Sequence, residues 1–295
     1  MTTIALIDIG GTQIKFGIMN ADTNHATTLG SIDTRTDLPD FNMLTRIDLV
    51  IHQIQQHTPT IQGIAISTAG VVNPDTGKIV HANPNIPNYA GKPLREELEQ
   101  AYGLPVSVEN DVNAALLGEI YHGNHHPVSS ALMLTIGTGV GGALFLNHQI
   151  YHGYAFSAGE VGYSFLNDQN IEDVVSARAL VNRVQQTRPD EKVDGFYIFK
   201  QLEAQDPVIT DILDDYCQQL AKAIINQVSL INPEIVILGG GIMEQTDYFQ
   251  PKLTHYFEQF YTNQYAAQRT HIAFASLGNK AGLLGAYQHY KNQHL

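Results

Sequence analysis

The sequence predicts an α/β protein with mixed sheets, and its two halves are expected to be related domains. Near the start of each half, an apolar strand runs into a glycine-rich turn and then into a second apolar segment, a pattern typical of a β-hairpin. These segments are IALIDIGGTQIKFGIM from residue 4 and ALMLTIGTGVGGALFLN from residue 131. Further strands alternate with helical stretches, which indicates crossover connections between parallel strands. Hairpins and crossovers together predict sheets of mixed strand direction.

The other elements follow from their apolar patterns and from the glycine or proline residues at their ends. Between the hairpins we expect a strand at 61–67, a loop rich in Pro, Asn and Gly at 72–91, a helix at 93–103, a strand at 105–110 and a helix at 111–123. After Gly159 the chain becomes helical. The last third is expected to contain a helix at 206–233, a buried strand within 234–243 that runs into three glycines, a strand at 271–276 and a helix at 280–291.

The longest predicted helix, at 206–233, has one apolar face. The members of this face are three or four positions apart, which is the spacing of one side of an α-helix. They are Ile209, Leu213, Tyr216, Leu220, Ile224 and Val228. A helix of this kind is expected to pack on a sheet.

Composition limits the partners of the chain. With 29 acidic and 16 basic side chains the formal net charge is −13, and the sequence has no cluster of Lys and Arg that could bind a phosphate backbone or an anionic membrane. Nucleic acid and membranes are therefore not expected as partners. Cys217 is the single cysteine, so the chain has neither a disulfide framework nor a thiolate zinc site.

The sequence favours a soluble, cytoplasmic protein. The stretch MTTIALIDIGG lacks the pattern of a secretory signal, and no window approaches 18 consecutive apolar residues. The 13 histidines raise the question of a metal site, since His148 and His152, for example, are four positions apart. Polar loop histidines in a chain rich in His and Gln are the favoured interpretation.

The glycine-rich turns raise the question of which ligand they bind. Gly137, Gly139 and Gly142 satisfy the G-x-G-x-x-G spacing, but the dinucleotide motif needs its glycines to open a helix, whereas here a second strand follows. The P-loop motif and the protein-kinase H-R-D motif do not occur in the sequence. One Gly-Gly hairpin alone is usually a plain tight turn. Two of them, with a third glycine cluster at 239–241, favour turns whose backbone N–H groups bind the two ends of a polyphosphate.

Polar residues beside the first turn support this interpretation. Asp8 ends the first strand, Thr12 offers a hydroxyl group, and Lys15 supplies a positive charge. All three are suited to a phosphate group or to its counterion.

A second polar group lies at the end of the strand at 105–110. Glu109, Asn110 and Asp111 directly precede a helix. A carboxylate at this place could accept a hydroxyl proton, and the Asn amide could bind a polar substrate. The alternative is that Asn110 or Asp111 only caps the helix.

Five segments together resemble the ROK family of bacterial sugar kinases and repressors. In order along nearly the whole chain, they are DIGGTQIK (8–15), ENDVNAALLGE (109–119), IGTGVGG (136–142), AGEVGY (158–163) and LGNKAGLLGA (277–286). The resemblance implies the actin-like ATPase fold, also called ribonuclease-H-like, with two α/β domains and a central cleft. It also implies phosphoryl transfer from ATP to a sugar hydroxyl, with Mg²⁺ as the metal ion.

The resemblance implies roles for individual residues. Asp111 matches the base that accepts the proton of the hydroxyl under phosphorylation, and Asp8 is expected near Mg²⁺ through water. The residues that match sugar contacts are Asn85, Asn110, Glu160 and Glu172. Those that match the ATP-binding turns are Asp8, Gly10, Gly11, Thr12, Lys15, Gly137, Thr138, Gly139, Gly141, Gly239, Gly240 and Gly241.

One departure from the family pattern concerns zinc and the sugar. Many members have a His after GE-x-G and then a cysteine cluster that holds zinc, whereas this sequence has Tyr163 there and no cysteine before Cys217. No structural zinc is therefore expected. The AGE-x-GY form resembles members that act on β-glucosides or N-acetylmannosamine and some glucokinase-like ones. The 6-OH of glucose or a related hexose is the expected acceptor, and the other two sugars are the alternatives.

The resemblance also implies how the chain is organised. We expect an N-terminal domain at 1–112, with the helix at about 280–295 packing back on it, a C-terminal domain at 113–279, and a homodimer through the C-terminal domain. A sugar-sensing transcriptional regulator is an alternative function, but regulators of this family carry an N-terminal helix-turn-helix domain, whereas here the first predicted strand starts by Ile4. A catalytically silent sugar-binding scaffold is a third hypothesis. It predicts damage to Asp111 or to the glycine turns, and both are intact.

Overall fold

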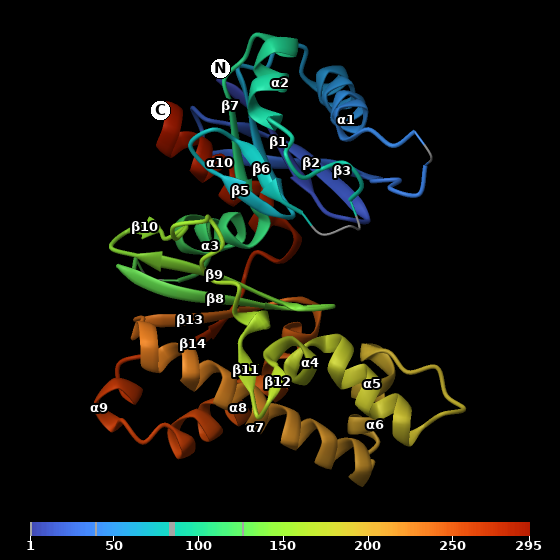
Figure 1. Cartoon of the computed structure of the whole chain (residues 1–295), viewed down its shortest axis with the longest axis vertical. Coiled ribbons are helices and arrows are strands. Elements are labelled where there is room, and N and C mark those ends of the chain that lie inside the picture. Colours follow the sequence, from blue (N-terminus) through green and yellow to red (C-terminus); the bar gives the residue numbers. More distant parts are fainter. Residues whose placement is uncertain (1, 39, 83–85, 126) are drawn as a thin grey trace. The chain divides into compact units, whose positions relative to one another are not determined.

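A computed structural model describes residues 2–38, 40–82, 86–125 and 127–295 of the chain (Figure 1). These residues form two compact units, each made from separate stretches of the chain. Unit 1 contains Met1–Pro127, His152–Ser157 and Ser276–Leu295, and unit 2 contains Val128–Tyr151 and Ala158–Ala275. The division differs from the boundary expected after residue 112, because the whole helix that follows Asn110 and the short segment His152–Ser157 belong to unit 1.

Unit 1 is built on a five-stranded sheet in the order β3-β2-β1-β4-β7. The strands are β1 (Thr3–Ile9), β2 (Gln13–Asn20), β3 (His25–Asp33), β4 (Gly63–Thr68) and β7 (Val106–Asn110). β1 and β2 form the predicted antiparallel hairpin, β3 continues it, and β1, β4 and β7 are parallel. Because these three strands are parallel and in register, Asp8, Ser67 and Glu109 are neighbours across the sheet.

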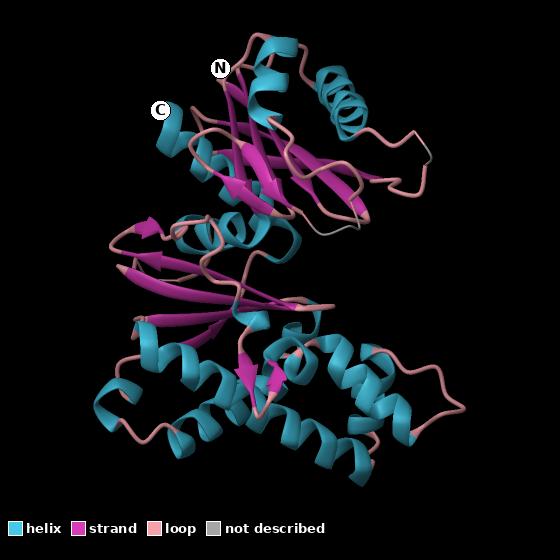
Figure 2. Cartoon of the chain, viewed as in Figure 1, coloured by secondary structure: helices cyan, strands magenta, loops and turns pink. Residues whose placement is uncertain are grey.

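Helices cover both faces of this sheet (Figure 2). The alternation of side chains along β1 explains why, since Ala5, Ile7 and Ile9 belong to one apolar core and Ile4 and Leu6 to another. The first core contains residues of α1 (Met43–His57) and α2 (Leu94–Tyr102), and the second contains residues of α10 (Ala281–His294), which also packs on α3 (Asp111–His122). The small elements of unit 1 are β5 (Val71–Asn73), β6 (Lys78–His81) and the 3₁₀ helix η3 (Gly278–Lys280).

Unit 2 repeats the arrangement of strands found in unit 1. Its sheet has the order β10-β9-β8-β13-β14. The strands are β8 (Ser130–Ile136), β9 (Val140–Leu146), β10 (Gln149–Ile150), β13 (Ile235–Gly239) and β14 (His271–Phe274). β8 and β9 form the second predicted hairpin, β10 pairs antiparallel with β9, and β8, β13 and β14 are parallel. In both units a glycine-turn hairpin is therefore followed in the sheet by parallel strands.

The remaining elements of unit 2 are mostly helical. They are η1 (Val161–Tyr163), β11 (Phe165–Leu166), β12 (Gln169–Asn170), α4 (Ile171–Val175), α5 (Ala177–Thr187), α6 (Gly195–Glu203), α7 (Pro207–Ile231), η2 (Gly241–Glu244), α8 (Thr246–Phe260) and α9 (Gln264–Ala267). All six residues of the predicted apolar face of α7 are fully buried. The helix begins after Asp206, whose side chain accepts hydrogen bonds from the N–H groups of Val208 and Ile209, and it ends at Asn232 in the left-handed conformation.

Candidate active site

The turn between β1 and β2 is the first glycine-rich turn. A hydrogen bond from Gly10 N to Gln13 O closes it at 2.9 Å. Thr34, which directly follows β3 and which the sequence did not single out, holds this turn: its Oγ1 donates to Gly10 O at 2.7 Å and its N–H to Thr12 O at 2.8 Å. Gly11 and Thr12 are exposed, and no heavy atom lies within 4 Å of the place that a Cβ on Gly11 would take. Thr34 therefore holds the turn, while the space beside Gly11 is open, as an anion-binding turn requires.

Asp8 lies near the end of β1, opposite Lys15 on β2. Its Oδ1 accepts a hydrogen bond from Ser67 Oγ at 2.8 Å, and a Cβ on Gly282 in α10 would be only 2.9 Å from Asp8 Cγ. Burial raises the pKa of Asp8 above its ordinary value, although the hydrogen bond from Ser67 and the charge of Lys15 act against this. Lys15 Nζ donates to Asn279 Oδ1 at 2.8 Å. A further cation beside Asp8 would favour its ionised form.

The structure places Asn110 at the N-cap of α3 and Asp111 at the first helical position. Asn110 Oδ1 accepts from the N–H groups of Val112 at 2.9 Å and Asn113 at 3.0 Å, while its Nδ2 donates to Gly70 O and to Asp111 Oδ1, both at 2.9 Å. Asp111 Oδ1 also accepts from Val112 N at 2.9 Å. Asn110 is thus the N-cap of α3, the alternative role that the sequence offered for Asn110 or Asp111. Its side-chain amide also fixes the orientation of the Asp111 carboxylate.

Glu109 is fully buried directly before this pair. Its Oε1 accepts from Asn110 N at 2.8 Å and from Asn113 Nδ2 at 3.2 Å, and its Oε2 lies 2.8 Å from His152 Nε2 and 3.5 Å from His289 Nδ1. Burial alone would raise the pKa of Glu109, but the hydrogen bond from His152, the charges of both histidines and the Asn110 N–H together lower it. The sequence pointed to Glu109 without a separate role and gave no sign of its two histidine partners.

The turn between β8 and β9 is the second glycine-rich turn. Gly137 N donates to Gly139 O at 3.0 Å, Gly137 O accepts from Ala177 N at 2.9 Å, and Thr138 is exposed at the tip. Glu172 from α4 lies beside this turn, because a Cβ on Gly139 would be 2.5 Å from Glu172 Oε2. The structure therefore brings Glu172, which the sequence placed among the sugar contacts, next to residues placed among the ATP contacts.

The AGEVGY segment packs against β9, the strand that carries Gly141. A Cβ on Gly142 would be 2.4 Å from Gly159 O, so the two backbones approach each other as only glycine permits. Glu160 follows at the start of η1, where its side chain is exposed, and Tyr163 ends η1 with 65% of its surface exposed. The IGTGVGG and AGEVGY motifs therefore pack directly against each other within unit 2.

The third glycine cluster ends β13. Gly239 is buried, Gly240 has a positive φ of 104°, and Gly241 is exposed at the start of η2. A Cβ on Gly240 would be 2.2 Å from Ile136 O, directly before Gly137. The second and third glycine clusters therefore lie side by side in unit 2.

Gly240→Ala is expected to lower the free energy of unfolding by about 1–3 kcal/mol, because the added Cβ meets the backbone of Ile136 and because φ is positive. Urea denaturation measures this change. Gly241→Ala is the matched control, since a Cβ there meets no heavy atom within 4 Å. Equal stability of the two variants would contradict the close contact between Gly240 and β8.

The profile of the ROK family matches residues 4–293, a range that includes both glycine hairpins and the Asn110–Asp111 pair. This chain belongs to the ROK family.

Relatives within the family cover essentially the whole chain. A β-glucoside kinase from Klebsiella pneumoniae is 33% identical over 298 residues, which cover 97% of this chain and 95% of that protein. A Listeria monocytogenes protein proposed to be an N-acetylmannosamine kinase is similar in structure, with a TM-score of 0.87, 30% identity and full coverage of both chains. A ROK family glucokinase from Streptomyces griseus, solved in complex with glucose and AMPPNP, has a TM-score of 0.81 and 25% identity, with 97% of this chain and 98% of that chain covered.

The chain has the actin-like ATPase fold of these ROK structures, as the sequence resemblance predicted. In this chain, the mixed sheet of each unit, with a hairpin followed by parallel strands, is typical of this fold.

Three sequence predictions concern Asn85, metal binding and membrane spans. Asn85 lies outside the described residues. Among the described residues no group of three or more His, Cys, Asp and Glu side chains is arranged to hold a metal ion. The same part of the chain contains no helix that is long and apolar enough to span a membrane.

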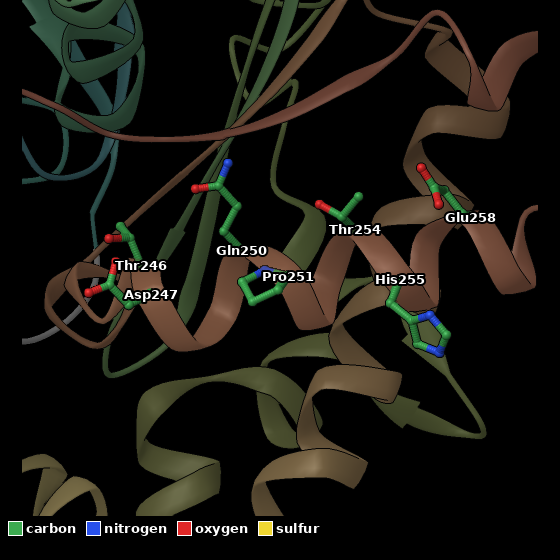
Figure 3. A pocket seen from close by; sticks show the side chains of 7 residues that line it. All are labelled: Thr246, Asp247, Gln250, Pro251, Thr254, His255 and Glu258. Carbon is green, nitrogen blue, oxygen red and sulfur yellow. The ribbon is translucent and has the colours of Figure 1, made fainter.

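A shallow hollow of about 600 Å³ lies along α8 (Figure 3). Its walls come from one side of a single helix. They are Thr246, Asp247, Gln250, Pro251, Thr254, His255 and Glu258. Since no glycine turn and no residue of the predicted site lines this hollow, it is not the candidate active site.

Proposed function

We propose that this ROK-family protein is an ATP-dependent sugar kinase that transfers the γ-phosphate of ATP to the 6-OH of glucose or a related hexose. The class of reaction follows from the family and from relatives that are named as sugar kinases. The observation that carries the proposal is the Asp111 carboxylate, which the Asn110 cap and the first turn of α3 hold in one orientation.

Asp111 is proposed as the base. Phosphoryl transfer needs in-line positioning and a group that accepts the proton of the attacking hydroxyl. Two N–H donors hold Asp111 Oδ1, one from the side chain of Asn110 and one from the backbone of Val112. A carboxylate held in this way is ready for the sugar hydroxyl and does not need to be ordered during the reaction.

The sugar is proposed to bind beside this base. Asn110 is assigned a contact to a sugar hydroxyl because its side chain lies next to Asp111. Glu160, at the start of η1, and Glu172, in α4, are assigned as carboxylates that accept hydrogen bonds from sugar hydroxyl groups. Asn85 keeps the sugar-binding role that its place in the family motif gives it.

The glycine turns are proposed to bind ATP. Backbone N–H groups of the open β1–β2 turn, with Thr12 and Lys15, would meet one part of the triphosphate, and the β8–β9 turn another. The cluster at 239–241 would lie beside the nucleoside. The residues assigned to ATP are Asp8, Gly10, Gly11, Thr12, Lys15, Gly137, Thr138, Gly139, Gly141, Gly239, Gly240 and Gly241.

The surroundings of Asp8 fit a Mg²⁺ ion. Mg²⁺ prefers carboxylate oxygens and commonly keeps several of its waters. Ser67 orients one oxygen of Asp8, and burial raises the pKa of Asp8, so that a nearby cation would stabilise the charged carboxylate. We infer that Asp8 holds Mg²⁺ through water, where the ion would neutralise charge on the phosphates. Structural zinc is not part of the proposal, because Tyr163 stands in place of the family histidine.

The identity of the sugar separates the alternatives within the family. N-acetylmannosamine and β-glucosides are the two alternative acceptors, because relatives of this chain are named as kinases of these sugars. The exposed Tyr163 and Glu160 are neighbours in the segment proposed to contact the sugar, so they are candidates for this selection. A homodimer and a cytoplasmic location stay predictions from the sequence.

The test is a set of sugars offered with Mg·ATP. Glucose, mannose, fructose, N-acetylmannosamine, N-acetylglucosamine and cellobiose are supplied one at a time, ADP release is measured, and NMR of the product locates the phosphate. We expect strong turnover of glucose or a related hexose and a 6-phosphate product. Turnover of N-acetylmannosamine or cellobiose alone would transfer the proposal to that alternative. If no sugar releases ADP although a thermal shift reports sugar binding, the kinase assignment is wrong and a sensor or scaffold takes its place.

A further inference from the structure

A buried carboxylate, that of Glu109, lies two positions before the proposed base Asp111. The Glu109 side chain has no exposed surface, and both of its oxygens meet donors. Oε1 accepts from Asn110 N at 2.8 Å and from Asn113 Nδ2 at 3.2 Å, while Oε2 is 2.8 Å from His152 Nε2. A carboxylate without access to water stays ionised only when such partners surround it. The position of Glu109 therefore depends on these contacts.

His152 reaches Glu109 from a distant part of the sequence. The two residues are 43 positions apart, and His152 begins the short segment His152–Ser157, which belongs to unit 1 although the chain before and after it belongs to unit 2. Since an ionised carboxylate only accepts hydrogen bonds, the His152 ring must carry a proton on Nε2. The His152–Glu109 hydrogen bond is thus a link between this inserted segment and the end of β7.

We propose that His152 is a positioning residue for phosphoryl transfer, which holds Glu109 and through it the Asn110–Asp111 pair. This inference rests on the proposed function, in which Asp111 is the base. The contacts run without a gap: His152 donates to Glu109, Glu109 accepts from Asn110 N, and Asn110 Nδ2 donates to Asp111 Oδ1. Without His152, Glu109 Oε2 loses its nearest side-chain donor. The buried carboxylate must then rotate or take up a proton, and either change disturbs its hydrogen bond with Asn110 N.

His289 does not replace His152 in this role. Its Nδ1 is 3.5 Å from Glu109 Oε2, compared with 2.8 Å for His152, and its ring is nearly fully buried on α10. Burial lowers the pKa of His289 more than the charge of Glu109 raises it. The short, direct donor to the Glu109 carboxylate is therefore His152.

A simpler alternative is that His152 only anchors the segment His152–Ser157. The two roles differ in what they change. An anchor affects stability or the movement of the segment, whereas a positioning residue lowers kcat and leaves the KM for ATP nearly unchanged. A positioning role also requires that any side chain with a donor at the place of Nε2 restores activity.

The test uses three variants of the full chain with Mg·ATP and the sugar that the wild type phosphorylates. His152→Leu removes the donor, His152→Asn keeps a polar side chain that is too short to reach Glu109, and His152→Gln places an amide N–H near the position of Nε2. His25→Leu, at an exposed histidine of unit 1, is the matched control. We expect kcat to fall about 10- to 100-fold in the Leu and Asn variants, with KM for ATP changed by less than about 3-fold, and to return to within about 3-fold of wild type in the Gln variant.

Hydrogen exchange of the peptide 106–118 gives a readout that does not depend on activity. Faster exchange in the Leu and Asn variants, with wild-type exchange in the Gln and His25→Leu variants, supports the proposal. An unchanged kcat in folded His152→Leu, or a Gln variant as slow as the Leu variant, overturns it. Should His152→Leu fail to fold, His152→Asn decides in the same way. If the wild type phosphorylates no sugar, the proposed function fails by itself, and unchanged exchange of 106–118 in the Leu and Asn variants would then reject the link to Glu109.

Discussion

Asp111→Asn is expected to lower kcat for sugar phosphorylation by about 10²- to 10⁴-fold, the usual contribution of a general base. An Asn side chain still offers an oxygen to Asn110 Nδ2 and Val112 N, which both lie 2.9 Å from Asp111 Oδ1, so the first turn of α3 should persist. The variant loses the ability to accept the hydroxyl proton. We therefore expect its dissociation constant for the sugar, measured by calorimetry, to stay within about 3-fold of wild type.

Asp190→Asn is the matched control for this variant, because it makes the same chemical change at an exposed residue outside the ROK motifs. Its kcat should equal that of the wild type. Full activity of Asp111→Asn would remove Asp111 from the role of base. A loss of sugar binding that is as large as the loss of kcat would show instead that Asp111 acts mainly in holding the sugar.

Local patterns in the sequence were sufficient for the features that depend on local chemistry. Both hairpins could be predicted because the glycines lie between two apolar segments and no helix start follows them. The apolar face of α7 could be predicted because one helix repeats its contacts every three or four residues. In the same way, Asn110 and Asp111 were recognisable from their place between a strand and a helix.

Other features needed the tertiary structure. The pair His152–Glu109 joins residues 43 positions apart, and spacing along the chain says nothing about such a contact. The place of Glu172 beside Gly139 depends on how α4 packs against the hairpin. The family motif that indicated a sugar contact for Glu172 carries no information about this neighbour.

Among the elements that the sequence did not lead us to expect, β3 and α1 differ in the signal that they carry. β3 has mostly exposed or partly exposed residues at the edge of its sheet, so HATTLGSID lacks the apolar alternation of an inner strand. α1, by contrast, carries a clear signal, since Met43, Ile47, Val50, Ile51 and Ile54 are buried on one face. The spacing of these residues is therefore sufficient to predict this helix.

Gly285→Ala is expected to destabilise unit 1 strongly. A Cβ on Gly285 of α10 would be 1.6 Å from the carbonyl oxygen of Ala114 in α3, and a rigid helix backbone cannot yield in the way a flexible side chain does. α10 must therefore move away from α3 and from the sheet, which opens the core around Leu283 and Tyr287. Overpacking of this kind typically costs about 1–3 kcal/mol and occasionally more, and we expect the upper end.

The loss of stability should be accompanied by a loss of activity, because α3 carries the proposed base at its first position. Urea denaturation gives the free energy of unfolding, and kcat for the preferred sugar reports the displacement of Asp111. Gly195→Ala, at the first residue of α6, is the matched control: a Cβ there meets no heavy atom within 4 Å, and alanine is a better helix former than glycine, so stability should be equal or higher. If Gly285→Ala were as stable and as active as Gly195→Ala, α10 could not pack on α3 as closely as described. The inference that α10 holds the start of α3 in place would then be wrong.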